Sequence, residues 1–359
     1  MNKDPFKEYI KESEPEKRDK GYAWHTAIGL QAVDGLKTSQ YLVDTAIRNI
    51  EGDISIDEAS ELLNSYYEEN PKTENDDRTE EADKVALRIA KILSEKAFSF
   101  TPNEYISIHK KLFVGIYKHA GKIRDYNITK KEWVLNGATV MYGSASELRT
   151  TLDYDFSEEK KFSYKNLSMD GIIHHLAVFV SRLWQIHIFA EGNTRTTAVF
   201  FIKYLRTLGF DATNDIFAEN AWYFRSSLVR ANYNNLRNGV HETTEYLELF
   251  LRNLLLEEKN ELHNRSMHIS GSLKADIENT KADIEKILTN IDDVIENKTV
   301  MHVTALYEEC GRNNVFGRSG VERITGLKST RASEIIKLML ENDVIEPVRG
   351  QGKGKYRFK

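Results

Sequence analysis

Apolar residues recur every three or four positions through most of this chain, which is the spacing of helices that bury one face. Between residues 21 and 70 the pattern predicts a small helical module. Its periodic apolar positions include Leu30, Val33, Leu42, Ala46 and Ile50. A charged stretch at 1–20 precedes this module and is predicted to be a mobile tail. The polar stretch ENPKTENDDRTEE at 69–81 follows it as a solvated connection.

Helical patterns return after residue 80. The segments 81–96 and 101–121 predict strong helices, and Thr101 with Pro102 marks the start of the second helix, which Gly121 would end. Two further segments, 171–186 and 196–208, are apolar on most sides and are expected to be central helices.

The C-terminal half continues the helical pattern at about 220–259 and 272–297. The polar sequence HNRSMHISGS between them suggests a hinge or a domain boundary. We divide the rest of the chain into a core at 85–255, a helical linker at 256–299 and a separate module at 300–359.

Only one part of the core predicts β structure. In KKEWVLNGATVMYG, at 130–143, Asn136 and Gly137 stand between Val134/Leu135 and Ala138/Thr139/Val140. That is the sequence of a two-residue type I′ hairpin. An isolated hairpin in a helical domain has no sheet to join, so it would present a free edge.

The candidate chemistry lies in QIHIFAEGNTRTTAVF, at 185–200, between the two central helices. His187 could accept a proton near neutral pH. Glu191 could hold a hard divalent ion such as Mg²⁺. Free backbone amides around Gly192 and Asn193 would form an anion site at a helix start, and Arg195 adds a cation suited to phosphate. This set predicts phosphoryl or nucleotidyl transfer.

The same residues resemble the motif of the Fic family, H-P-F-x-[DE]-G-N-G-R-x-x-R, in the form HIFAEGNTRTTA. The resemblance extends over about 85–255, through AFSFTPNEYISIHKKLFVGIYKHAGKIRD before the motif and WYFRSSLVRANY after it. It implies an all-α fold and transfer of AMP from ATP to a Ser, Thr or Tyr hydroxyl of a target protein or of the enzyme itself, with release of pyrophosphate.

The resemblance also implies roles for individual residues. His187 would deprotonate the target hydroxyl, and Glu191 would bind Mg²⁺. The nucleotide-binding residues would be Gly192, Asn193, Thr194, Arg195 and Asn232, the last with Phe224 or Arg225 around the base and ribose. The hairpin at 130–142 would be the family's flap, which aligns the target segment as an added strand.

Two positions depart from the family motif. Thr194 replaces the second glycine, so a β-branched side chain would strain the loop if that position needs a positive φ. Ala198 replaces the final arginine, which helps the family hold the terminal phosphate. These departures bear on ATP affinity and on the choice of nucleotide.

The module at 21–70 resembles the family's antitoxin-like modules, which carry an inhibitory [ST]-x-x-x-E-G helix. In one register Asp34 stands for the inhibitory glutamate before Gly35, and in a second register Glu51 does so before Gly52. We prefer Asp34. Because Ala198 removes the arginine that this acid normally pairs with, we expect inhibition to be weak or rewired. The alternative is that the module is a structural helical cap.

The module at 300–359 predicts a winged helix. GVERITG and STRASEIIKLMLEND read as helix, turn and helix with Ser329 as cap, and Val344–Val348 could pair with Tyr356–Phe358 around a Gly and Lys wing. Its 11 Lys and Arg against 7 Asp and Glu give a net charge of +4 in a chain of net charge −5. DNA contacts are predicted at Arg331, Lys337, Arg349 and Lys353, although winged helices also bind proteins.

Composition limits the remaining classes. No apolar run approaches the roughly 18 residues of a membrane span, and the start of the chain has no signal-peptide core, so we expect a cytoplasmic protein without a membrane partner. A lone Cys310 excludes an intramolecular disulfide framework. His174 and His175 are expected to be packing residues. A homo-oligomer is compatible with the sequence, and the main alternative function is a DNA-binding regulator that senses nucleotide without turnover.

Overall fold

The structure is a computed structural model that falls into two compact units, residues 1–271 and 272–359. The residues that it describes are 9, 14–70, 78–212, 216–269, 302–303, 306–307, 309–310, 315–341, 344–348 and 354–358. The predicted helices at 272–297 lie outside these residues.

The N-terminal module is helical, as the pattern predicts. Its elements are α2 (Pro15–Gly29), the 3₁₀ turn η1 (Leu30–Asp34), α3 (Gln40–Glu51) and α4 (Ile56–Glu69). Because α2 begins at Pro15, the end of the predicted tail is helical. A capping box between Ser55 and Glu58 starts α4, satisfying two backbone donors that a helix start leaves free.

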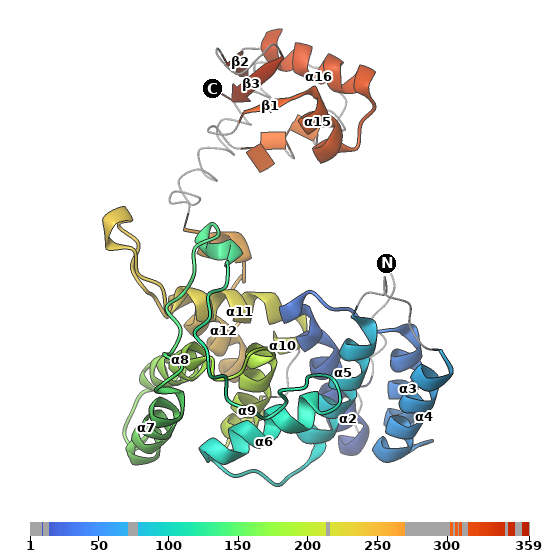
Figure 1. Cartoon of the computed structure of the whole chain (residues 1–359), viewed down its shortest axis with the longest axis vertical. Helices are drawn as coiled ribbons and strands as arrows, with labels where there is room; N and C mark the ends of the chain where they lie inside the picture. Colours follow the sequence, from blue (N-terminus) through green and yellow to red (C-terminus); the bar gives the residue numbers. More distant parts are fainter. Residues whose placement is uncertain are drawn as a thin grey trace. The chain divides into compact units, whose positions relative to one another are not determined.

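Eight helices of the described residues form the rest of the first unit (Figure 1). They are α5 (Thr79–Ser94), α6 (Pro102–Phe113), α7 (Leu148–Lys161), α8 (Met169–Ile186), α9 (Asn193–Thr207), α10 (Ile216–Glu219), α11 (Ala221–Arg230) and α12 (Glu245–Leu256). Helix α9 packs against α5, α6, α8 and η1, and its side chains from Asn193 to Leu205 are all buried. The two central helices are therefore as predicted.

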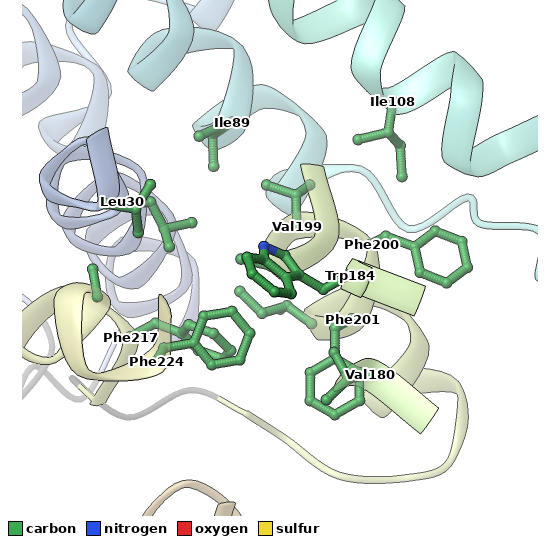
Figure 2. Packing of buried hydrophobic residues seen from close by; sticks show 14 of the residues in the cluster. Leu30, Ile89, Ile108, Val180, Trp184, Val199, Phe200, Phe201, Phe217 and Phe224 are labelled. Carbon is green, nitrogen blue, oxygen red and sulfur yellow. The ribbon is translucent and has the colours of Figure 1, made fainter. Parts of the chain in front are cut away.

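The N-terminal module and the central helices share one hydrophobic core. Figure 2 shows Leu30 of η1 and Ile89 of α5 in the same packing as Trp184 of α8 and Phe201 of α9. Helix α2 lies along α5, and Trp24 is buried between elements. The module is thus built into the first unit and does not form a core of its own.

Two predicted helices are shorter than their patterns suggest. Helix α6 ends at Phe113 and not at Gly121, because Val114 leaves helical geometry with a ψ of 131° and the next residue, Gly115, takes a φ of 76°. The predicted helix at 220–259 is two helices, α11 and α12, separated by the 3₁₀ turn η3 (Leu236–Asn238). Positive φ at Gly239 contributes to this interruption.

The segment 130–142, called the flap below, has the predicted turn but not the predicted strands. Asn136 and Gly137 have φ values of 52° and 83°, and the Ala138 N–H donates to the Leu135 carbonyl, as in a type I′ turn. The first arm, however, is the 3₁₀ turn η2 (Trp133–Leu135). The Asn136 N–H donates to Trp133 in this turn, so the arm is not an extended strand.

Another 3₁₀ turn, η4 (Asn264–Met267), lies in the predicted helical linker at 256–299. It packs against α11 and against the flap turn η2, and Ile269 donates its N–H to the Val134 carbonyl. The boundary between the two units, at 271 and 272, falls in the polar stretch that suggests a hinge.

The second unit contains β1 (Phe316–Gly317), α15 (Arg318–Thr325), α16 (Ser329–Glu341), β2 (Ile345–Pro347) and β3 (Lys355–Phe358). The strands form an antiparallel sheet in the order β1-β3-β2, with Ile345 opposite Phe358. This order of elements is compatible with the winged-helix prediction, which remains a prediction. Ser329 is the first residue of α16 and not its cap, and β1 is not predicted from the sequence.

No helix in the described part of the chain is both long and apolar enough to cross a membrane. Cys310 is buried in the core of the second unit, and burial raises the pKa of its thiol.

Candidate functional site

The residues of the candidate site follow one another between α8 and α9. Helix α8 ends where His187 takes a left-handed conformation, with φ 51° and ψ 54°. Gly192 is also left-handed, with φ 76°, and α9 begins at the next residue, Asn193. The two turns direct the chain out of one buried helix and into the next within six residues.

His187 is held in the tautomer that a general base needs. Its side chain is buried, and Nδ1 donates a hydrogen bond to the Trp184 carbonyl at 3.3 Å, which leaves the lone pair on Nε2. The ring of Tyr142 lies 4.4 Å from the imidazole, centroid to centroid. Nε2 is buried and has no hydrogen-bond partner among the described residues.

Burial sets the charge state of this histidine. Desolvation holds the pKa of His187 well below its ordinary value, and the positive charge of Lys130 lowers it further. A hydrogen bond to the Trp184 carbonyl opposes this shift but does not reverse it. His187 is therefore neutral and able to accept a proton at pH 7.

Side chains from inside and outside the loop fix its backbone. Asn193 Oδ1 accepts from the Phe189 N–H at 3.0 Å, and Asn193 Nδ2 donates to the Phe189 carbonyl at 2.7 Å. His109 of α6 stacks on Phe189 with ring centroids 3.6 Å apart and donates from Nε2 to the Glu191 carbonyl at 3.0 Å. Its Nδ1 accepts from the Gly121 N–H, which fixes this tautomer.

The loop presents a row of backbone donors. In the described residues, the N–H groups of 190–195 have no protein acceptor, whereas the Thr196 N–H already bonds to the Gly192 carbonyl. Unpaired N–H groups at a helix start, together with the helix dipole, attract phosphate. The loop requires glycine at position 192, because its φ is 76° and a Cβ there would lie 2.4 Å from the Phe113 ring. This row is called the anion nest below.

The two departures from the motif are accommodated without strain. Thr194 lies in the first turn of α9 with helical geometry, so the concern about a β-branched residue at positive φ does not apply. Its hydroxyl accepts a hydrogen bond from the Trp184 indole at 3.0 Å. Ala198 is fully buried in the core.

Arg195 is surrounded by protein. Its side chain is fully buried, and Nη1 donates to Gln31 at 3.0 Å while Nη2 donates to Glu81 at 2.7 Å and to Tyr117 at 3.1 Å. The guanidinium also lies over the Phe113 ring, at 4.8 Å. The cation is thus not exposed to a ligand in this conformation.

Asp34 of η1 completes the shell around Arg195. Its Oδ2 lies 2.8 Å from Arg195 Nε, although the N–H is not aligned on an acceptor, so the two groups meet as an ion pair. The alternative residue, Glu51, instead pairs with Lys17 at 2.8 Å on the surface of α3 and α2. The geometry therefore favours Asp34 over Glu51 as the acid that faces the site, and the arginine that it meets is Arg195.

Glu81 of α5 is a second acid on Arg195 that the sequence does not point to. Burial alone would raise the pKa of Glu81, but hydrogen bonds from Tyr117 and Arg195 hold it below its ordinary value. Arg78 also donates to Glu81, through both Nε and Nη2. Arg195 is consequently held by two carboxylates from different helical elements. We call Gln31, Asp34, Glu81 and Tyr117 the Arg195 shell.

Glu191 points away from the core beside the anion nest. Its side chain is 54% exposed, and Oε2 lies 3.2 Å from Lys130 Nζ of the flap. A solvated carboxylate next to a phosphate site fits Mg²⁺, which is usually held by one or two carboxylates plus substrate phosphates. No cluster of three or more potential metal ligands occurs in the described residues.

The remaining predicted residues contact other groups of the first unit. Asn232 donates from Nδ2 to the carbonyls of Ser181 and Leu228, and Phe224 is fully buried. Arg225 forms an ion pair with Glu132 of the flap at 2.7 Å, anchoring the flap to α11. A role of Asn232 around the base and ribose stays a prediction.

In the second unit, Arg331 and Lys337 lie exposed on α16. Each has a carboxylate one turn further on, Glu334 at 2.8 Å and Glu341 at 3.6 Å. Arg349 and Lys353 lie outside the described residues. DNA binding by these four residues stays a prediction.

His174 and His175 contact carboxylates of the helical core. His175 stacks on Phe162 and bonds to Glu159 at 2.7 Å, while His174 bonds to Glu248 at 2.7 Å. His175 is partly buried, as expected for a packing residue, whereas the His174 side chain is 62% exposed, so the packing expectation does not hold for His174.

Comparison with known proteins agrees with this geometry. Residues 99–205 match the family model described as the Fic/DOC family. This segment is a Fic/DOC family domain. It includes the flap, His187 and the anion nest, whereas Asp34, Glu81 and the second unit lie outside the matched residues.

A Fic family protein of known structure, from Desulfovibrio desulfuricans G20, aligns with 98% of this chain and 90% of its own, at 12% identity and a TM-score of 0.42. A likeness at this level adds nothing to the assignment of the Fic domain. Among proteins of curated function, none matches the sequence.

Proposed function

We propose that this protein is an adenylyltransferase that moves AMP from ATP to a Ser, Thr or Tyr hydroxyl of a target protein or of itself. One observation carries the proposal: a neutral histidine with an unpartnered Nε2 lies just before a row of unpaired backbone donors in the same loop. A base beside an anion nest is the arrangement that transfer of a phosphorus-centred group requires.

In the proposed reaction one bond to phosphorus forms and one breaks, and His187 takes up the proton of the hydroxyl. The hydroxyl oxygen attacks the α-phosphorus of ATP and gives its proton to His187 Nε2. The bond between the α-phosphorus and the bridging oxygen to the β-phosphate breaks, and pyrophosphate leaves. N–H groups of the anion nest, at 190–195, stabilise the charge that develops on the phosphate oxygens.

Glu191 is the residue that would hold Mg²⁺ with the phosphates. The bound ion would offset phosphate charge. Lys130 pairs with the same carboxylate, so a bound cation must either displace Lys130 from Glu191 or share the carboxylate with it.

Two features describe a resting conformation. His187 Nε2 is covered, and Arg195 is enclosed by its shell. Access of the target hydroxyl requires Nε2 to become uncovered, and the ring of the flap residue Tyr142, which lies against the imidazole, would take part in that movement. Contact of Arg195 with the distal phosphates requires Asp34 and η1 to move, so the N-terminal module acts as a restraint on nucleotide binding.

Purified full-length protein incubated with Mg²⁺ and ATP labelled on the α-phosphate, with and without cell lysate, tests the proposal. We expect label on protein with wild type and none with His187→Ala. The matched variant His187→Asn keeps a residue type that tolerates a left-handed backbone, so it separates loss of the base from strain at φ 51°.

Label carried equally by wild type and both variants would contradict a role for His187. Nucleotide binding without transfer in wild type would favour the alternative, a DNA-binding regulator that senses nucleotide.

A further inference from the structure

We propose that Arg124 is a positioning residue for the transfer reaction, whose guanidinium joins the main chain at His187 to the main chain that ends the flap. The base and the segment that docks the acceptor hydroxyl would then be held in one register. This inference rests on the proposed function.

Arg124 lies in the loop after α6 and contacts three separate parts of the chain. Nε donates to the His187 carbonyl at 2.7 Å, and Nη2 donates to the Gly143 carbonyl at 2.6 Å. A longer bond joins Nη2 to the Ile186 carbonyl, at 3.4 Å, and Nη1 donates to the Tyr126 carbonyl. One planar group thus spans the end of α8 and the end of the flap.

The backbone of Arg124 reinforces the same contact. Its N–H donates to the Ile188 carbonyl at 2.9 Å. Together with the side chain, Arg124 therefore binds the carbonyls of three successive residues, 186–188, around the left-handed His187. A non-glycine residue in that conformation is strained and persists where its surroundings fix it.

The main chain at Gly143, just after the flap, also lies close to the end of α8. Gly143 follows the flap directly, and its N–H donates to the Gln185 carbonyl. A Cβ at Gly143 would lie 2.9 Å from the Ile186 carbonyl oxygen, so the chain passes tightly against the end of α8. Movement of this point would move the flap relative to His187.

Arg124 is an unusual buried cation. Its side chain is 4% exposed, and no carboxylate within the described chain forms an ion pair with it. Burial lowers the pKa of its guanidinium. Backbone carbonyl oxygens take the place of a carboxylate around this guanidinium. The planar guanidinium has five donors and can bond to several carbonyls at once, whereas the compact ammonium of lysine cannot.

The contacts of Arg124 avoid the anion nest. They end at residue 188, and the loop beyond is held by His109 and Asn193. Loss of Arg124 should therefore affect the chemical step and leave nucleotide binding in place. Misplacement of a reacting group by about 1 Å can lower a rate by roughly 100-fold.

Arg124→Lys and Arg124→Ala in the full-length protein test this inference. We expect both to lower kcat for AMP transfer by roughly 100-fold with an unchanged dissociation constant for ATP. Millimolar guanidinium should restore part of the activity of Arg124→Ala, and ethylammonium should not, because only guanidinium reproduces the fork.

A readout independent of activity is the titration of His187 followed by NMR of its imidazole. Lys130, Arg124 and Arg225 are the cations whose charge lowers the pKa of His187, in addition to burial. In Arg124→Ala the His187 pKa should rise, since the imidazole loses a neighbouring cation and gains access to water. If the wild type transfers no AMP, the proposed function fails. The His187 titration then still tests whether Arg124 holds the main chain at His187.

Arg88→Ala is the matched control, because Arg88 of α5 also donates to a backbone carbonyl, that of Leu112 at 2.8 Å, but contacts neither His187 nor the flap. It should leave the His187 titration unchanged. The proposal is overturned if Arg124→Lys retains full kcat, or if Arg124→Ala loses ATP binding together with activity, leaves the His187 titration unchanged and is not rescued by guanidinium. If Arg124→Ala does not fold, Arg124→Lys provides the kinetic test, since it keeps the positive charge and removes only the planar fork.

Discussion

Gly192 brings the base and the anion nest together at the residue scale. Its φ of 76° and the 2.4 Å that would separate a Cβ from the Phe113 ring are two distinct obstacles to any side chain. We expect Gly192→Ala to destabilise the fold by more than the roughly 1 kcal/mol that left-handed backbone costs an alanine, and to weaken ATP binding. Urea unfolding and nucleotide titration measure the two effects.

Gly209→Ala is the control for this prediction. Gly209 has a φ of 88°, and a Cβ at this position would meet no atom within 4 Å, so the substitution carries the backbone cost alone. Equal losses of stability in the two variants would show that contact with Phe113 is unimportant.

The pH dependence of transfer should also be set by one residue. Because the pKa of His187 lies well below its ordinary value, the base remains unprotonated as pH falls through 6.5, and it is lost only at more acidic pH. We expect the acidic limb of kcat/KM to lie below the reference value of about 6.5 for an unperturbed histidine. Because kcat/KM reports the free enzyme, an acidic limb at or above that value would contradict the burial of His187 in the free protein.

Single residues also show which parts of the candidate site the sequence can predict. His187, Glu191 and Arg195 lie close together along the chain, so their spacing alone predicts one site. Glu81 reaches Arg195 across 114 positions and Arg124 reaches His187 across 63, and each lies in a segment whose local pattern is ordinary. Contacts of this kind depend on packing of distant helices and leave no local signal.

At the scale of elements, η1 and α5 hold Arg195 from two directions. Because Glu81 and Tyr117 still bind the guanidinium when Asp34 is removed, we expect Asp34→Ala to strengthen ATP binding by less than tenfold, roughly 1.4 kcal/mol. The double variant Asp34→Ala/Glu81→Gln should strengthen ATP binding more than Asp34→Ala alone. It should also have a lower melting temperature, because the buried Arg195 then lacks both of its carboxylates.

Asp57→Ala is a suitable comparison, since Asp57 pairs with Lys91 on the surface, at 2.6 Å, away from Arg195. Calorimetric titration with ATP compares these variants. An increase of several orders of magnitude from Asp34→Ala alone would show that Glu81 does not share the restraint.

The ends of helices and strands likewise depend partly on the local sequence and partly on contacts with distant segments. The apolar spacing predicts α8 and α9 well because both are buried on most sides. It predicts α6 too long because periodicity continues past Phe113, while Gly115 reverses the chain. In the flap, Asn136 and Gly137 specify the turn correctly, but contacts with η4 and the Glu132–Arg225 ion pair hold its first arm as a 3₁₀ turn.

At the scale of the whole molecule, the two ends of the chain should tolerate truncation differently. Removal of residues 1–36 takes away Trp24, Ala27, Leu30 and Val33, all buried in the core of the first unit. Exposing the apolar surface beneath them costs about 25 cal/mol per Å², so we expect insoluble or unfolded protein. Removal of residues 272–359 takes away a unit with its own core and should leave a folded protein.

Circular dichroism and thermal melting of the two truncated proteins test this difference. A soluble, cooperatively melting protein that lacks 1–36 would show that the N-terminal module is dispensable for folding.

The position of Asp34 on a segment whose neighbours are buried limits how activity can evolve. Leu30 and Val33 precede Asp34 in the same segment and are fully buried, so loss of the segment by proteolysis or a gene split would also remove part of the hydrophobic core. Gain-of-function selection should consequently recover substitutions at Asp34 and Gln31, whose side chains touch Arg195, and not at Leu30 or Val33. The restraint that we propose for Asp34 would therefore be relieved by movement within the folded protein, and not by loss of its segment.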